Sequence, residues 1–140
     1  FYFMLGNTTI LLIDDRETII ENVKRTFLEV NIKHTLFSAA NENEAWLLLD
    51  GSHKLNPVPK IILIDVNRTD NEGINFLKAL RTNIDLRSIL VFVITDAEQE
   101  VNKAAALQLN IAGYVALKFE SDILNFSFSI LNDYWNIIEF

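Results

Sequence analysis

The stretch TILLIDD at residues 9–15 decides the fold. An apolar, β-branched run ends abruptly in two acids, Asp14 and Asp15. Such a short run is typical of a strand buried on both faces, as in a parallel sheet. The pattern returns in IILID at residues 61–65, which ends in Asp65. The chain therefore contains at least two predicted parallel strands that each lead directly into an acid.

Helix patterns alternate with strand patterns along the rest of the chain. We expect strands at 9–13, 34–39, 61–64, 89–94 and 113–117, and helices at 18–28, 42–49, 73–81, 98–109 and 121–138. This alternation predicts an α/β fold with right-handed crossovers. At this size we expect a flavodoxin-like (βα)5 three-layer sandwich, whose five-stranded parallel sheet has the strand order 2-1-3-4-5.

The composition favours one acidic domain. The 140 residues are 50% hydrophobic and carry 12 Lys+Arg against 19 Asp+Glu, for a net charge of −7. We expect no second globular unit within them, residues 1–8 being a leader and residues 9–140 the domain. The negative charge argues against direct nucleic-acid binding. The lack of cysteine excludes a disulfide scaffold, a thiolate zinc site and a cysteine nucleophile.

The apolar runs are far shorter than the roughly 20 residues of a membrane span. The sequence begins with Phe1, Tyr2 and Phe3 before Met4, without the basic region of a signal peptide. One explanation for these three residues is an origin outside the natural chain. We therefore expect a cytoplasmic protein without membrane insertion.

Residues suited to phosphoryl chemistry follow the expected strands. They are Asp14, Asp15, Asp65, Thr95 and Lys118. The active crevice of such a sheet lies at the carboxyl ends of the strands, where the strand order reverses. Three carboxylates there would repel one another, and Mg²⁺ would relieve the repulsion. Each residue alone has an ordinary explanation, such as a helix N-cap, but together they predict phosphoryl transfer to a carboxylate.

Four separated blocks resemble the receiver domain of two-component response regulators. They are residues 11–15, residues 61–67 followed by Gly73, residues 93–95, and Gly113-Tyr114 leading to Lys118. The resemblance spans the chain from about Thr8. Residues 81–89 resemble the segment between the third helix and the fourth strand of single-domain receivers similar to those that partner phytochrome-type kinases.

The resemblance implies a role for each site residue. Asp65 would accept a phosphoryl group from a sensor histidine kinase or phosphotransfer protein. Asp15, Asp65 and the backbone carbonyl of Asn67 would hold Mg²⁺, with Asp14 acting indirectly. Thr95 and Lys118 would contact the phosphoryl group. Such a protein is not an enzyme with a separate substrate, although it assists its own phosphorylation and dephosphorylation, and it signals by a conformational change that alters partner binding.

Several positions depart from the family pattern. Phe119 replaces the usual Pro after the lysine, Asp96 replaces a small residue after Thr95, and Arg68-Thr69 replaces an apolar residue and a Pro. The switch aromatic normally lies three residues before the lysine, at Val115, whereas this chain has Tyr114 one residue earlier. We therefore expect Thr95 with either Tyr114 or Val115 to form the switch.

The last helix carries more apolar residues than one buried stripe requires. We expect there either a wide core contact or a surface that forms a homodimer or binds another partner. His34 and His53 lack metal-ligand spacing and are predicted to be ordinary surface residues.

Two other functions stay open from the sequence. A degenerate receiver would act as a phosphorylation-independent interaction module. An enzyme of similar architecture fits less well: Asp14 to Glu17 is the electrostatic opposite of a flavodoxin phosphate loop, and Asp65-Val66-Asn67 lacks the second acid of haloacid-dehalogenase-like phosphatases.

Overall fold

The computed structural model describes residues 9–32, 34–65, 72–95 and 108–116. In chain order its elements are β1 (Thr9–Ile13), α1 (Glu17–Glu29), β2 (Thr35–Ala39), α2 (Glu42–Leu49), β3 (Ile61–Ile64), α3 (Glu72–Thr82), β4 (Leu90–Thr95) and β5 (Gly113–Ala116). These follow the predicted alternation and differ from it only at element ends. The leader over 1–8 and the helices predicted over 98–109 and 121–138 fall outside the described residues, apart from a turn at 108–110. Among the described helices, none is long and apolar enough to cross a membrane.

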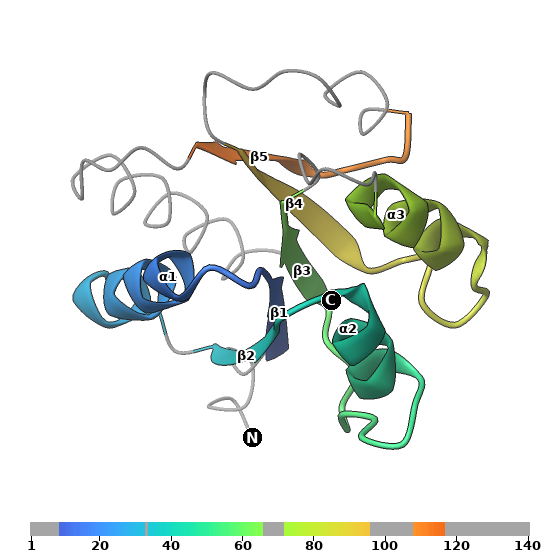
Figure 1. The fold of residues 1–140 in the computed structure, drawn as a ribbon, viewed down its shortest axis with the longest axis horizontal. Coiled ribbons are helices and arrows are strands. Elements are labelled where there is room, and N and C mark those ends of the chain that lie inside the picture. The colour runs from blue at the N-terminus through green and yellow to red at the C-terminus, as the bar shows by residue number, and fades with distance from the viewer. Residues whose placement is uncertain (1–8, 33, 66–71, 96–107, 117–140) are drawn as a thin grey trace, which may run out of the picture.

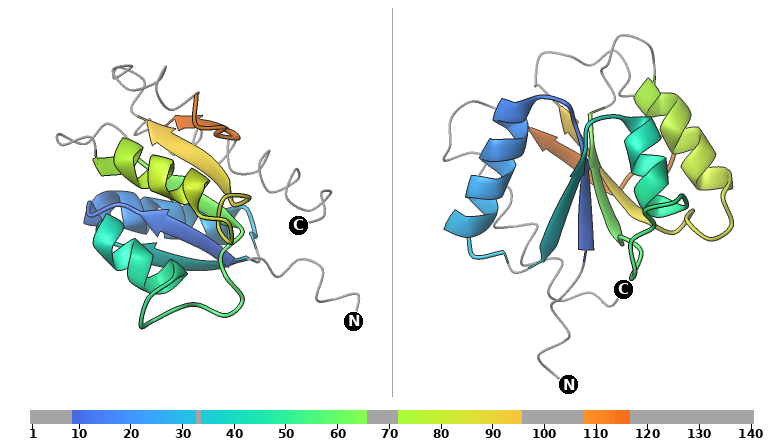
Figure 2. Two further views of the ribbon diagram at one scale, coloured as in Figure 1. Left: turned by 90° about the vertical axis from the view of Figure 1, so that its right-hand side faces the viewer. Right: turned by 60° about the horizontal axis from the view of Figure 1, so that its bottom comes forward.

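The five strands form one parallel sheet. Its order is β2-β1-β3-β4-β5, and every neighbouring pair is parallel, which confirms the predicted topology. Helix α1 covers one face of the sheet, and α2 and α3 cover the other (Figures 1 and 2). The carboxyl ends of all five strands consequently point the same way, which brings the residues that follow them to one edge.

Two hydrophobic cores lie on opposite faces of the sheet, because successive strand residues point in opposite directions. Toward α1, the strands contribute Ile10, Leu12, Ile61, Leu63, Phe92 and Ile94. Toward α2 and α3 they contribute Leu11, Ile13, Ile62, Ile64, Val91 and Val93. The strands β1 and β3 are fully buried on both faces, as their unbroken apolar sequences predict.

Helix α1 buries one stripe of side chains and stops at a local backbone signal. Ile19, Val23 and Phe27 are buried at helical spacing. After the helix, Asn31 adopts a positive φ of 58°, a conformation that Asn tolerates better than most residues. The next amide, that of Ile32, donates back to the carbonyl of Phe27 at 2.8 Å. This arrangement satisfies a carbonyl that the helix leaves open and turns the chain toward β2.

Helix α2 begins at a reciprocal cap. The side chain of Asn41 accepts a hydrogen bond from the amide of Glu44 at 2.9 Å, while Glu44 accepts one from the amide of Ala40 at 2.6 Å. This capping box satisfies two backbone donors at the helix start. Trp46 on α2 then packs against Phe76 on α3 with ring centroids 4.9 Å apart, which joins the two helices on this face.

His34 contradicts the prediction of a surface histidine. It is only 7% exposed, whereas His53 is exposed as predicted. His34 lies just before β2, two residues after the buried Ile32. A single histidine has no periodic pattern of its own, so the sequence around it could not distinguish a buried entry to an edge strand from an exposed one.

Arg81, at the end of α3, forms hydrogen bonds with two other segments of the chain. Its guanidinium donates hydrogen bonds to the carbonyl oxygens of Arg87 and Ile89, at 2.7 and 2.8 Å, just before β4. It also donates to the carbonyls of Leu109 and Asn110, at 2.8 and 3.0 Å, in the turn before β5. Partial burial lowers the pKa of Arg81. One side chain thus satisfies four backbone acceptors that belong to no helix or strand ladder.

Replacing Leu63 by Ala should lower the free energy of unfolding by about 2–5 kcal/mol, because it leaves a cavity in a fully buried strand. Leu28→Ala is the control, since Leu28 is 83% exposed, and its effect should be below about 0.5 kcal/mol. Urea unfolding followed by circular dichroism measures both. Equal losses in the two variants would contradict the assigned core.

Arg81→Met should destabilise the domain by about 3 kcal/mol, because four backbone carbonyls lose a charged donor and two of these hydrogen bonds are part-buried. Arg87→Met removes the same kind of side chain from an exposed position nearby and should have little effect. Thermal unfolding of both variants tests the difference. A midpoint for Arg81→Met equal to that of Arg87→Met would show that the Arg81 contacts contribute nothing.

Candidate phosphoacceptor site

The site is built by the pairing of β1 with β3. The two strands are parallel neighbours, and Ile13 at the end of β1 is in register with Ile64 at the end of β3. Asp14 and Asp65 are the residues that follow this pair. The backbone amide of Asp14 donates to the carbonyl of Ala39 in β2 at 3.0 Å, which extends the sheet pairing to the site. Two carboxylates are therefore placed side by side by the strand register.

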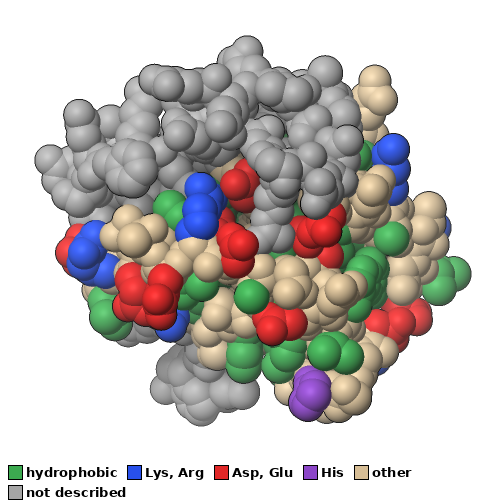
Figure 3. Space-filling model, in the orientation of Figure 1, with side chains coloured by type: hydrophobic (Ala, Val, Ile, Leu, Met, Phe, Trp, Pro, Cys, Tyr) green, Lys and Arg blue, Asp and Glu red, His purple; other side chains and the backbone are tan. Residues whose placement is uncertain are grey.

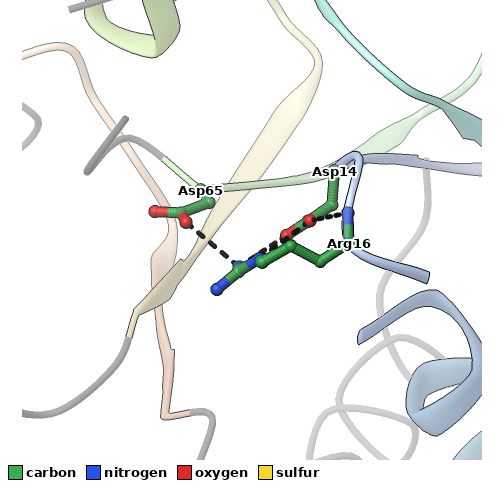
Figure 4. A network of polar contacts seen from close by, with 3 residues as sticks. All are labelled: Asp14, Arg16 and Asp65. Atoms are coloured by element: carbon green, nitrogen blue, oxygen red, sulfur yellow. Dashed lines mark hydrogen bonds and ion pairs between the residues drawn. The ribbon is translucent and has the colours of Figure 1, made fainter. Parts of the chain in front are cut away.

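Arg16 links the two carboxylates. Its Nη2 atom lies 2.7 Å from Oδ2 of Asp14 and 3.0 Å from Oδ2 of Asp65 (Figure 4). Its Nε atom donates to Oδ1 of Asp14 at 3.0 Å, so the contact with Asp14 is bidentate. This is the fork geometry in which guanidinium and carboxylate interact most strongly. The two strand ends are thus held together by one cation.

Asp14 is the buried member of the cluster. Its side chain is 1% exposed, against 16% for Asp65 and 44% for Arg16. A buried carboxylate is costly unless it is paired and hydrogen-bonded. Asp14 meets this requirement through the Arg16 guanidinium and through the Arg16 backbone amide, which donates to its Oδ1 at 2.8 Å. Asp14 therefore shapes the turn between β1 and α1 as well as the charge of the site.

Among the residues that the structure describes, Arg16 lies within the electrostatic reach of three acids. The hydrogen bond to Asp14 raises the pKa of Arg16, and the charges of Asp14, Asp65 and Asp15 raise it further, although burial acts in the opposite direction. Asp15 itself is exposed. Acidic side chains are also visible at several places on the face viewed in Figure 3. Three acidic side chains therefore act on the charge of Arg16 at this edge of the sheet.

The structure describes only part of the predicted site. It brings Asp14 and Asp65 together, and Thr95 ends β4 on the same edge of the sheet. The backbone of Tyr114 and Val115 lies in β5, in register with Val93 and Ile94. The side chains of Thr95, Tyr114 and Val115, together with Asn67, Arg68, Thr69, Asp96, Lys118 and Phe119, fall outside the described part. Their predicted roles stay predictions.

In the described ranges, no group of three or more His, Asp or Glu side chains could hold a metal ion without further ligands. A magnesium site here would therefore need ligands in addition to these carboxylates, and the predicted Asn67 carbonyl would be one. Oxygen donors and water are the ligands that Mg²⁺ prefers.

Arg16 was not among the predicted site residues. The available signal was its position, since a cation follows two acids at the end of a buried strand. Within such a short turn, a long basic side chain can reach back to the carboxylate two residues earlier. That signal predicts a local contact with Asp14, but the contact with Asp65 requires the strand pairing, which brings in a residue 49 positions away.

A family comparison matches most of this chain. The response regulator receiver domain matches residues 10–125. The chain belongs to the receiver family. Receiver domains of response regulators act in two-component signalling.

Individual relatives are single-domain response regulators. Response regulator Rcp1 of Synechocystis sp. is 28% identical over 108 residues, which cover 76% of this chain and 74% of Rcp1. A two-component response regulator from Legionella pneumophila is 34% identical, with a TM-score of 0.74 and coverage of 91% of this chain and 99% of that one.

Two further solved structures share the fold at lower identity. The phosphorylated cyanobacterial phytochrome response regulator RcpA has a TM-score of 0.80 at 17% identity, with coverage of 96% and 97% of the two chains. The Mn²⁺-bound form of Rcp1 has a TM-score of 0.78 at 24% identity, with coverage of 95% and 97%.

Proposed function

We propose that this chain is a stand-alone receiver that accepts a phosphoryl group on Asp65 from a histidine kinase or phosphotransfer protein. The observation that carries the proposal is the pair of carboxylates at the adjacent ends of β1 and β3, held around one cation in a receiver fold. Asp65 is the more accessible of the two, at 16% exposed against 1% for Asp14. An incoming phosphodonor can therefore reach Asp65 and not Asp14.

The donor set fits a magnesium ion. Asp65, Asp15 and the backbone carbonyl of Asn67 would hold it, and Asp14 would act through water or by orientation. The fit is supported by the cation that Asp14 and Asp65 already share and by the effect of the Asp15 charge on Arg16. When bound, the metal would neutralise charge that develops on the phosphoryl oxygens.

The chain's own residues would carry out the transfer. An oxygen of Asp65 attacks the phosphorus of a phosphohistidine, so that a bond from oxygen to phosphorus forms while the bond from phosphorus to nitrogen breaks. The electron pair of the broken bond stays on the imidazole. Lys118 pairs first with Asp65 and then with the phosphoryl group, and Thr95 donates to a phosphoryl oxygen. Both would stabilise negative charge spread over the equatorial oxygens.

The output is a change in partner binding. A phosphoryl group adds nearly two negative charges next to Thr95, at the end of β4. Thr95 and an aromatic or apolar residue of β5, either Tyr114 or Val115, would rearrange together and shift the population between two surface conformations. A homodimer through the last helix is one assembly that such a shift could control.

Asp65→Asn should abolish phosphorylation, because the amide nitrogen and oxygen cannot form the acyl phosphate. Intact mass measured after incubation with Mg²⁺ and acetyl phosphate should show one phosphate adduct on the wild type and none on this variant. Asp50→Asn is the matched control, since Asp50 is exposed and lies at the end of α2, and it should be modified like the wild type.

An adduct on Asp65→Asn equal to that on the wild type would exclude Asp65 as the acceptor. No adduct on any of the three proteins would favour a degenerate receiver that binds partners without phosphorylation. Asp96 and Phe119 are the sequence features that support this second function, because they replace a small residue and a Pro next to the expected phosphoryl contacts. Asp96→Ala would then be the next variant to phosphorylate.

A further inference from the structure

We propose that Arg16 is an internal counter-cation that competes with Mg²⁺ for Asp14 and Asp65 and so raises the Mg²⁺ concentration at which the site fills. The inference rests on the proposed function in taking these carboxylates to be part of the metal site. It concerns one side chain that the turn between β1 and α1 presents to the sheet edge.

The contacts show why the two cations compete. The guanidinium engages both carboxylate oxygens of Asp14 and one oxygen of Asp65. It therefore satisfies the same groups that a divalent ion would need, and it lies between them (Figure 4). A Mg²⁺ ion bound to Asp65 would stand a few ångströms from this positive charge and would be repelled by it. Filling of the metal site thus requires that the guanidinium move away from Asp65.

The surrounding structure permits that movement. The Arg16 side chain is 44% exposed, so solvent is available to the guanidinium when it leaves. Arg16 is the N-cap residue of α1, and the first helix bonds use its backbone: the amides of Ile19 and Ile20 donate to its carbonyl at 3.0 and 3.1 Å. Its own amide remains bonded to Asp14. The side chain can therefore swing out while the turn and the helix start stay in place.

The charge balance explains the benefit of such a residue. Asp14, Asp15 and Asp65 all raise the pKa of Arg16 by their charge, so Arg16 offsets repulsion among these acids when no metal is bound. Without it, the metal-free site would carry one positive charge fewer and would attract divalent ions more strongly. A receiver with this arginine would exchange phosphoryl groups only when Mg²⁺ is plentiful enough to displace it.

The test is Mg²⁺ binding measured by isothermal titration calorimetry, without any phosphodonor. Arg16→Gln should bind Mg²⁺ roughly tenfold more tightly than the wild type, which is the change expected when a charge-assisted hydrogen bond no longer competes. Arg25→Gln is the matched control: it removes the same charge from an exposed position on α1, where Arg25 contacts Asn22 and Glu29. Its Mg²⁺ affinity should equal that of the wild type.

A second variant keeps the test decisive if Arg16→Gln folds poorly. Arg16→Lys retains one charge but loses the bidentate fork, so its affinity for Mg²⁺ should fall between that of the wild type and that of Arg16→Gln. Unchanged Mg²⁺ affinity in both Arg16 variants, or an equal gain in Arg25→Gln, would overturn the proposal. A change in melting temperature without a change in Mg²⁺ affinity would also overturn it, since that is the signature of a purely structural contact.

This outcome is separable from that of the phosphorylation experiment. Arg16 can control Mg²⁺ affinity in a receiver that takes no phosphate. Conversely, a phosphate adduct on Asp65 with unchanged Mg²⁺ affinity in the Arg16 variants would sustain the proposed function and reject the role of Arg16.

Discussion

The parallel pairing of β1 with β3 is the constraint on which the site depends. Apart from Thr9, both strands are apolar and buried on both faces, so their register is held by packing from two sides of the sheet. A slip of one residue would move every side chain to the other face. It would also separate Asp14 from Asp65. The hydrophobic cores therefore determine the distance between two carboxylates that take no part in either core.

Bringing acids together at a strand end conflicts with electrostatics, and the protein resolves the conflict locally. Asp14 is buried and would be costly to leave unpaired. Arg16 pairs with Asp14 from within the same turn and also contacts Asp65, which follows the neighbouring strand β3. The folding of the β1–α1 turn and the charge state of the site consequently depend on the same side chain. By our proposal, Arg16 therefore stabilises the metal-free site and at the same time weakens its affinity for metal.

The sequence predicted the strands and the topology well because their signals are local and periodic. The runs at residues 9–13 and 61–64 lack the pattern of an amphipathic helix, so they are read as strands. The five-fold alternation of strand and helix patterns then leaves few possible sheet topologies for a single domain. The sequence also predicted that Asp14 and Asp65 would lie close together, since the ends of parallel strands lie at one edge of the sheet. It failed where the outcome depends on contacts distant in the chain. The contact of Arg16 with Asp65 and the burial of His34 are both decided by neighbours that periodicity does not identify.

The sheet divides the described part of the interior into two compartments, and no buried side chain of one core belongs to the other. Adjacent residues such as Leu11 and Leu12 point into different cores, one under α2 and α3 and the other under α1. A change of volume in one compartment is therefore accommodated by different neighbours from a change in the other. Substitutions that repack the α1 side should therefore leave the contact between Trp46 and Phe76 in place.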